Sequence, residues 1–350
     1  MRPKRLNPLR SFKNARVVTI IRKRHNFLAL CTLRVVSTHQ WGNGLNIIEA
    51  VRGFGFVPGI SQTKRRSRSL AEQMGYSAHE RLLIIKCDDL GSSRSANSAI
   101  ERALREGLAS STTLMIPAPF ARAGADACRD FDVGVHLTLT SEFPTYRWGS
   151  LTGAASLHDR DGYLPRTTQE VWARAELDDI ERECRAQIER AFDWGLDVTH
   201  LDSHMDILQL DRHYFAVYMR LAKDYRLPVR LRRSHFESPF SSMSRVMLEK
   251  HGILTTDHFV SSPWGEPARP VLMRFVKSGG RGVSEIVLHP VDTGEELFGY
   301  DSENADIRAA DAECLMDQAL QNLVRSNDVR LIGYKPLREA MRRGLAARCA

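Results

Sequence analysis

The 350 residues, of which 43% are hydrophobic and 26% charged, suffice for one large domain or two ordinary ones with a full core. The net charge of +8 belongs to the N-terminal fifth. Residues 1–68 carry 15 Lys and Arg and one acid, Glu49, whereas the remaining 282 residues carry 35 basic and 41 acidic groups. The mildly acidic remainder argues against a nucleic-acid partner for the main part of the chain.

The basic segment 1–68 lacks sustained periodicity and ends in Lys64-Arg65-Arg66-Ser67-Arg68. Three interpretations are open: a disordered basic arm, a targeting segment, or upstream sequence translated from a start codon assigned too early. The last is favoured because Met74 directly precedes the first strong strand pattern. No apolar stretch approaches the roughly 20 residues that a membrane-spanning helix needs, so the sequence predicts no membrane span.

The cysteines are far apart and form no C-x-x-C pair, which argues against a zinc ribbon or a disulfide framework and predicts a reducing, cytoplasmic location. They are Cys31, Cys87, Cys128, Cys184, Cys314 and Cys349.

From Arg81 onward, strand-like and helix-like patterns alternate, which indicates βαβ units and a parallel sheet. The expected strands are Leu82–Cys87, Thr112–Ile116, Val133–Thr140, Thr199–Ser203, Pro228–Leu231, Ser284–His289 and Val329–Tyr334. The expected helices are Ser95–Glu106, Thr168–Trp194, Arg212–Tyr225 and Ala305–Ser326. About seven strands in this length favour a closed or nearly closed barrel. A doubly wound open sheet is the alternative, although no G-x-G-x-x-G follows the first strand.

Polar residues stand at the ends of several expected strands, where a barrel enzyme presents its reactive groups. They are Asp88 and Asp89, His136, His200 and His204, and His289. Singly, each has a structural explanation, since a lone histidine is often a core residue and Asp89 could cap a helix. Together they predict a metal site, because catalytic divalent ions take about three histidine or carboxylate ligands. A further carboxylate can then deprotonate the bound water.

The ordered motifs resemble the signature blocks of the YdjC-like (ChbG/HpnK-type) carbohydrate deacetylases over about residues 69–340. The blocks are Asp88-Asp89-Leu90-Gly91 with Asn97, Ser110-Ser111-Thr112-Thr113, Gly134-Val135-His136-Leu137-Thr138-Leu139-Thr140, Thr199-His200-Leu201-Asp202-Ser203-His204 and His289-Pro290. The resemblance implies a NodB-like, incomplete (β/α) barrel over residues 69–344. It also implies hydrolysis of N-acetyl groups from an acetylated, chitooligosaccharide-like carbohydrate. A homodimer is compatible with it.

The same resemblance implies roles for six residues. Asp89, His136 and His204 correspond to ligands of a divalent ion, Mg²⁺ or Zn²⁺. Asp88 corresponds to the general base, and His289 to the general acid or oxyanion partner. Arg230 resembles an arginine that orients the base carboxylate.

The sequence departs from the family pattern near this site. Met205-Asp206 follows the last ligand, where relatives continue with histidines, and Lys86-Cys87 precedes the carboxylate pair, where Asn or His and then Ala are common. Aromatic residues after the third strand, Tyr146, Trp148 and Tyr163, could stack on sugar rings or simply pack within their loop.

Two other functions remain open from sequence alone. One is a metallohydrolase of the same barrel that acts on a different amide or ester. A phosphoester is disfavoured because no glycine-rich phosphate loop accompanies the strand ends. The other is a binding role, either as an inactive family member or as a protein that the basic arm 1–68 directs to nucleic acid or an anionic membrane.

Overall fold

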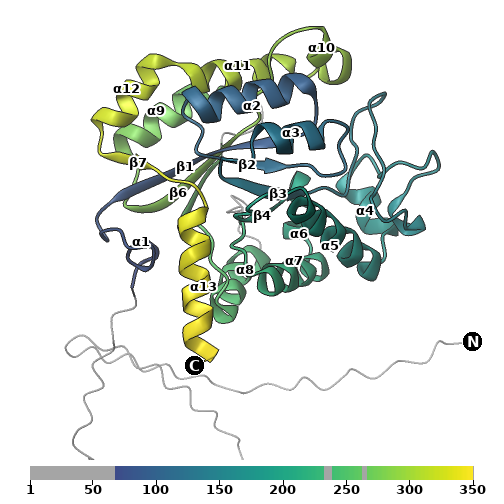
Figure 1. The fold of residues 1–350 in the computed structure, drawn as a ribbon, viewed down its shortest axis with the longest axis horizontal. Coiled ribbons are helices and arrows are strands. Elements are labelled where there is room, and N and C mark those ends of the chain that lie inside the picture. The colour runs from purple at the N-terminus through teal and green to yellow at the C-terminus, as the bar shows by residue number, and fades with distance from the viewer. Residues whose placement is uncertain (1–67, 232–238, 262–265, 350) are drawn as a thin grey trace, which may run out of the picture. The chain divides into compact units, whose positions relative to one another are not determined.

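The computed structural model describes residues 68–231, 239–261 and 266–349, which form an α/β domain around a parallel sheet (Figure 1). The expectations for the basic segment therefore lie outside the described residues, except at Arg68. Ser69 caps a short helix, α1 (Leu70–Gln73), in a capping box with Glu72. Leu70 and Ala71 are buried against the end of the barrel, so this helix upstream of Met74 belongs to the fold.

The central strand is β1 (Arg81–Leu90), which is buried almost throughout. Its continuous apolar run is typical of a strand covered on both faces. It pairs in parallel with β2 (Ser111–Leu114), β6 (Gly282–Leu288) and β7 (Val329–Leu331). The sheet continues through β3 (Val133–Leu137) and β4 (Leu201–Ser203) on one side, and through β5 (His258–Ser261) on the other. The parallel, incomplete barrel expected from the sequence is confirmed.

Six of the seven described strands overlap predicted strands, and one predicted strand and one described strand have no counterpart. Pro228–Leu231 is not a regular strand but an extended segment with one bridge, between Val229 and Leu201. It nevertheless extends the barrel, because Arg230 N donates to Leu201 O and Val229 N donates to Leu254 O, 3.0 Å in each case. Strand β5 was not predicted, since four residues that begin with histidine give too short a pattern.

Helices cover the outside of the sheet, with α2, α9, α11 and α12 on one side and α5, α7 and α8 on the other (Figure 1). The expected helix 168–194 is two helices that break at Ala175 and Glu176, and the expected helix 305–326 is two that break at Asp317. Asp317 ends the first and caps the second, since its side chain accepts from Leu320 N. The bounds are α2 (Arg94–Glu106), α3 (Ala121–Ala127), α4 (Thr168–Arg174), α5 (Leu177–Asp193), α6 (Ile207–Leu210), α7 (Arg212–Tyr225), α8 (Pro239–His251), α9 (Ala268–Ser278), α10 (Glu295–Asp301), α11 (Ala305–Met316), α12 (Gln318–Ser326) and α13 (Lys335–Cys349), with 3₁₀ turns η1 (Ala155–Leu157) and η2 (His204–Asp206).

Strand alternation divides the barrel interior into layers. Side chains alternate between the two faces of a strand, so Leu82, Ile84, Lys86 and Asp88 of β1 share the inner face. Leu82 and Ile84 pack with Val283, Ile332, Tyr334 and Leu337 in an apolar layer. Lys86 contacts charged groups from other strands in a second layer. Asp88 follows at the mouth, so the apolar layer closes one end of the barrel and the chemistry lies at the other.

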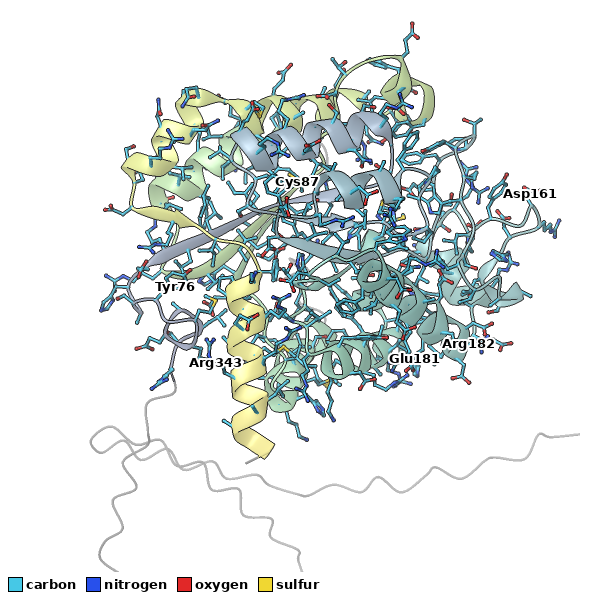
Figure 2. All side chains as sticks on the ribbon, viewed as in Figure 1. Tyr76, Cys87, Asp161, Glu181, Arg182 and Arg343 are labelled. Carbon is cyan, nitrogen blue, oxygen red and sulfur yellow. The ribbon has the colours of Figure 1, made fainter. Side chains whose placement is uncertain are left out.

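Among the described side chains, four cysteines are buried free thiols: Cys87, Cys128, Cys184 and Cys314. Figure 2 shows Cys87 deep between sheet and helices, in contrast to Asp161, Glu181 and Arg182 on the outside. Within the described residues, the helices are too short or too polar to cross a membrane.

We predict that Gly134→Ala destabilises the protein. A Cβ at Gly134 would lie 2.5 Å from the ring of His200, which is stacked at 3.8 Å on buried Tyr334 and cannot retreat. We expect a loss of about 1–3 kcal/mol in the free energy of unfolding, as for other overpacked cores, measured by denaturant titration. Gly299→Ala is the control, because a Cβ there meets nothing within 4 Å. Equal stability of the two variants would contradict the expectation.

Candidate active site

The two adjacent carboxylates reach the same cavity because β1 is irregular at its end. In a regular strand, Asp88 and Asp89 would point to opposite faces. The register between β1 and β2 shifts between Cys87 and Leu90, and Asp89 has left-handed backbone with φ 68°. Such a bulge redirects a side chain, and aspartate tolerates this backbone region better than most residues. Both carboxylates therefore line one cavity.

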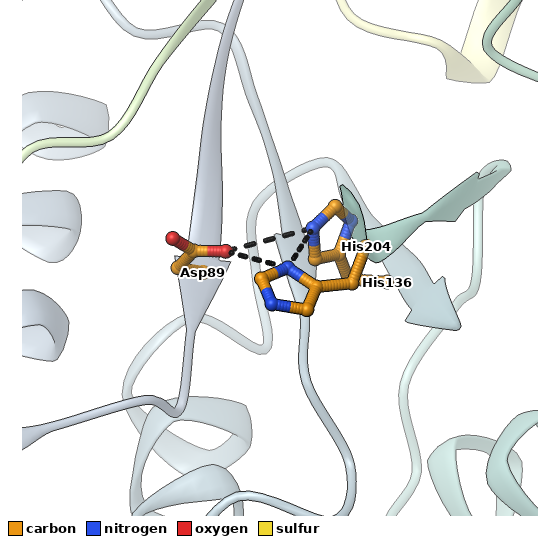
Figure 3. Close-up of side chains that lie close together, drawn as sticks. All are labelled: Asp89, His136 and His204. Carbon is orange, nitrogen blue, oxygen red and sulfur yellow. Dashed lines mark hydrogen bonds and ion pairs between the residues drawn. The ribbon is translucent and has the colours of Figure 1, made fainter. Parts of the chain in front are cut away.

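Asp89, His136 and His204 come together from three strand ends (Figure 3). Asp89 Oδ1 lies 3.5 Å from His136 Nε2 and 3.4 Å from His204 Nδ1, and the two ring nitrogens are 3.2 Å apart. All three side chains are buried. Because metal–ligand bonds are about 2 Å long, three donors at these separations suit one shared cation.

Arg308 on α11 contacts the other oxygen of Asp89. Its Nη1 lies 3.0 Å from Asp89 Oδ2, and its Nε donates to Asp301 at 2.7 Å. Burial opposes ionisation of Asp89. The neighbouring His204 and Arg308 favour the ionised form more strongly, so the pKa of Asp89 is held well below its usual value. Asp89 is thus a carboxylate with one oxygen on Arg308 and the other facing the histidines.

Glu142, in the loop after β3, lies behind His204. Its Oε1 is 3.1 Å from His204 Nε2, while His204 Nδ1 faces Asp89. Burial opposes protonation of His204, yet Glu142 and Asp89 raise its pKa well above the usual value. A carboxylate on the outer ring nitrogen of a histidine ligand fixes the ring orientation and increases its basicity.

Asp88 is held by its Oδ1, which takes its contacts with Thr113 and Lys86. Thr113 Oγ1 donates to this oxygen at 2.7 Å, and Lys86 Nζ lies 3.1 Å from it. Thr113 Oγ1 is also 3.3 Å from His136 Nδ1. A short polar chain therefore joins the predicted base to a predicted metal ligand, and Asp88 lines the cavity.

Arg230 does not contact Asp88 in the manner that the resemblance implied. Its Nη1 lies 3.2 Å from Asp202 Oδ1 and also pairs with Asp206, and its guanidinium lies 4.7 Å from the centroid of the Phe259 ring. Lys86 and Thr113 are the side chains on Asp88 instead. Arg230 is linked to the base through Asp202, because Lys86 bridges Asp202 and Asp88, and its charge also acts on Asp88 through space.

The departure after His204 forms a tight turn. Met205 and Asp206 both have left-handed backbone, with φ 54° and 58°. Asp206 turns inward to Arg230, while Met205 is 42% exposed and lines the cavity. The two residues after His204 thus supply one ion-pair partner for Arg230 and one apolar wall of the cavity.

His289 follows β6 and lines the same cavity, and its backbone N donates to Asp311 at 2.8 Å. Burial lowers the pKa of His289, and the carboxylates of Asp89 and Asp88, which act to raise it, do not compensate. The cavity has a volume of about 470 Å³. Its walls also include Phe143, Ser203, Phe259, Val287, Asp301 and Asn304.

Four residues that the sequence brought forward lie elsewhere. His200 is a core residue, stacked on Tyr334. Trp148 is buried and donates from its indole nitrogen to Thr140 O at 2.9 Å. Tyr146 and Tyr163 are not among the residues that line the cavity, whereas Phe143, from the same loop after β3, is.

Five residues of the site were missed by sequence reasoning: Lys86, Thr113, Glu142, Asp202 and Arg308. Lys86 offered a signal, since a cation inside an apolar strand must find buried carboxylates. Asp202 stood in a quoted motif between two histidines. Glu142 and Arg308 offered none, because only the fold brings a loop and a distant helix to the metal ligands.

The donor set fits a divalent cation. Asp89 Oδ1 is buried and has no hydrogen-bond partner of normal geometry among the described residues. Two imidazoles and a carboxylate with open space beside them resemble catalytic rather than structural sites. Without an ion, Glu142 and Asp89 raise the pKa of His204 and favour its protonated ring, so an ion bound there would displace that proton.

Known proteins share both the sequence and the fold. The model of the YdjC-like protein family matches residues 82–326. A carbohydrate deacetylase of Thermoanaerobacter pseudethanolicus is 27% identical over 260 residues, which span 73% of this chain and 99% of the relative. One of Geobacillus stearothermophilus is 30% identical over 259 residues, which span 73% and 97%.

Among solved structures, a protein of Enterococcus faecalis that is provisionally described as a cellobiose-phosphate cleavage protein has a TM-score of 0.64. It is 23% identical and covers 74% of this chain and 99% of its own. This likeness shows the fold alone. The domain is an incomplete-barrel hydrolase fold with a candidate metal centre, and the chain belongs to the YdjC-like family, whose curated relatives are carbohydrate deacetylases.

We predict that His136→Ala and His204→Ala each abolish stoichiometric divalent-metal binding, because each removes one of three donors. Metal content after loading and desalting, measured by elemental analysis, checks this. His213→Ala is the control, since His213 is exposed on α7. Unchanged metal content in both site variants would show that the ion binds elsewhere.

We predict that Glu142→Ala weakens divalent-metal affinity about 10-fold, toward the lower end of the range for lost partners of ligand histidines. Glu142→Gln should weaken it less, because the amide oxygen still accepts from His204. Calorimetric titration measures both. Equal affinity of Glu142→Ala and the parent protein would mean that Glu142 does not orient His204.

Proposed function

We propose that this protein is a metal-dependent hydrolase that removes N-acetyl groups from an acetylated, chitooligosaccharide-like sugar. The observation that carries the proposal is the placement of Asp88 beside the Asp89, His136 and His204 triad in one cavity. Curated relatives that match over nearly their whole length are named carbohydrate deacetylases, which supports the acetylated sugar as substrate.

Asp89, His136 and His204 would hold the ion, Mg²⁺ or Zn²⁺. When bound, such an ion supplies Lewis acidity toward a carbonyl oxygen and lowers the pKa of a water molecule. Asp88 accepts the proton of the attacking water on its second oxygen, since Thr113 and Lys86 occupy the first. Asp88 is thereby the general base.

His289 faces the cavity from the neighbouring strand and serves the leaving amine. As a general acid it first takes up the proton that Asp88 removed from the water, and the imidazolium then delivers it to nitrogen as the C–N bond breaks. As the neutral ring that burial favours, it instead donates a hydrogen bond from its N–H to the oxyanion. Arg230 acts at a distance, because it fixes Asp202 and Asp206 rather than the substrate.

The cavity suits a sugar amide in size and polarity. Its volume of about 470 Å³ falls within the usual range for small-molecule sites. Phe143, Met205, Phe259 and Val287 add apolar surface to a lining that also holds the charged residues. Sugar rings bring both C–H faces and hydroxyl groups, so a cavity with both kinds of wall favours them.

A cytoplasmic location and a homodimer remain predictions. The four buried free thiols support a reducing compartment.

Acetate release from a panel of N-acetylated oligosaccharides, with Mg²⁺, with Zn²⁺ and with chelator, tests the proposal. We expect release with metal and none with chelator. Asp88→Asn should lower kcat by about 10²–10⁴-fold, the usual contribution of a general base, with metal content unchanged. Absence of acetate release with every metal and sugar would reject the deacetylase, and full activity of Asp88→Asn would reject the base.

A further inference from the structure

Lys86 carries a fully buried ammonium group at the centre of three carboxylates. Its Nζ lies 3.1 Å from Asp88 Oδ1 and 3.5 Å from Glu285 Oε1, and it pairs closely with Asp202. These partners come from β1, β6 and β4, and each is at most 3% exposed. Burial opposes the charged form, but Asp202, Asp88 and Glu285 outweigh it and raise the pKa of Lys86.

The side chain that stands here must be a compact cation. An unpaired ion buried in the interior costs several kcal/mol. Without Lys86, Asp202 would keep Arg230, but Asp88 and Glu285 would lose the cation that they contact. Lysine provides three donors on one nitrogen and accepts none, which matches three acceptors that converge from different strands.

The surroundings of Lys86 resemble a second cation position. Asp88, His136 and Asp202 form a group of donors close enough to share an ion. The ammonium of Lys86 contacts two of the three, Asp88 and Asp202. Asp202 Oδ2 in turn lies 3.6 Å from His136 Nδ1. The protein thus supplies a fixed positive charge on the inner side of the metal triad.

We propose that Lys86 is a positioning residue that acts on Asp88 as a built-in second cation. It holds Asp88 by Oδ1, together with Thr113, so that Oδ2 faces the cavity. This inference rests on the proposed function, in which Asp88 is the general base.

Lys86→Met tests the inference, because methionine has a similar length and no charge. We expect kcat for acetate release to fall about 100-fold, near the lower limit for loss of a general base. KM should change less than about twofold, because Lys86 is buried beneath Asp88 and does not line the cavity. Metal content should stay at the parental value. Parental kcat, or a loss of metal that accompanies the loss of kcat, would overturn the proposal.

A charge-balanced variant separates positioning from simple stability. Lys86→Met with Glu285→Gln removes one buried positive and one buried negative charge, so it should unfold at a higher temperature than Lys86→Met alone. We expect kcat to stay low in this double variant, whereas its recovery to the level of Glu285→Gln alone would show that Lys86 only neutralises charge. Where Lys86→Met does not fold, the double variant carries the same test.

The parent protein distinguishes the two failures. If it releases no acetate, the proposed function fails. If it releases acetate and the Lys86 variants do so equally well, only the role of Lys86 fails.

Discussion

The site depends on a layer of charges enclosed in the barrel, with Asp202 at its centre. Asp202 is fully buried, pairs with Lys86 and Arg230, and lies 3.6 Å from His136. Below it the apolar layer excludes water, so each charge in the layer relies on protein partners. A carboxylate held by two cations can stay ionised there, and its pKa is held well below the usual value despite the cost of burial. The reactive groups at the mouth rest on this layer.

The bulge in β1 is the second constraint. Adjacent residues of a strand face opposite ways, and two neighbouring carboxylates could not serve one substrate without an irregularity. Left-handed backbone at Asp89 turns it inward, next to Asp88. One carboxylate then faces the histidines while the other is anchored by Thr113 and Lys86. The division between ligand and base that we propose thus begins as a backbone feature.

Several predictions from sequence were wrong in instructive ways. Periodicity predicted a strand at Pro228–Leu231, where only Val229 forms a bridge, and overlooked β5. Both lie near the seam of the incomplete barrel, where pairing depends on the opposite edge rather than on local pattern. The orienting role that the resemblance implied for Arg230 stays a prediction, because Arg230 pairs with Asp202 and Asp206 while Lys86 contacts Asp88 directly. A motif shows that an arginine is present, but it does not show which carboxylate the arginine will contact in the folded protein.

The sequence by itself determined the alternation of strands and helices and the parallel barrel, and it brought forward Asp89, His136 and His204 as candidates, because apolar runs followed by Asp and His mark strand ends. Tertiary structure decided which groups touch. Glu142 behind His204 and Arg308 on Asp89 come from a loop and a helix that no local pattern connects to the ligands. His200, in the same motif as His204, went to the core through its stacking on Tyr334. Side-chain periodicity is a local property, whereas charge pairing depends on distances that exist only after the barrel forms.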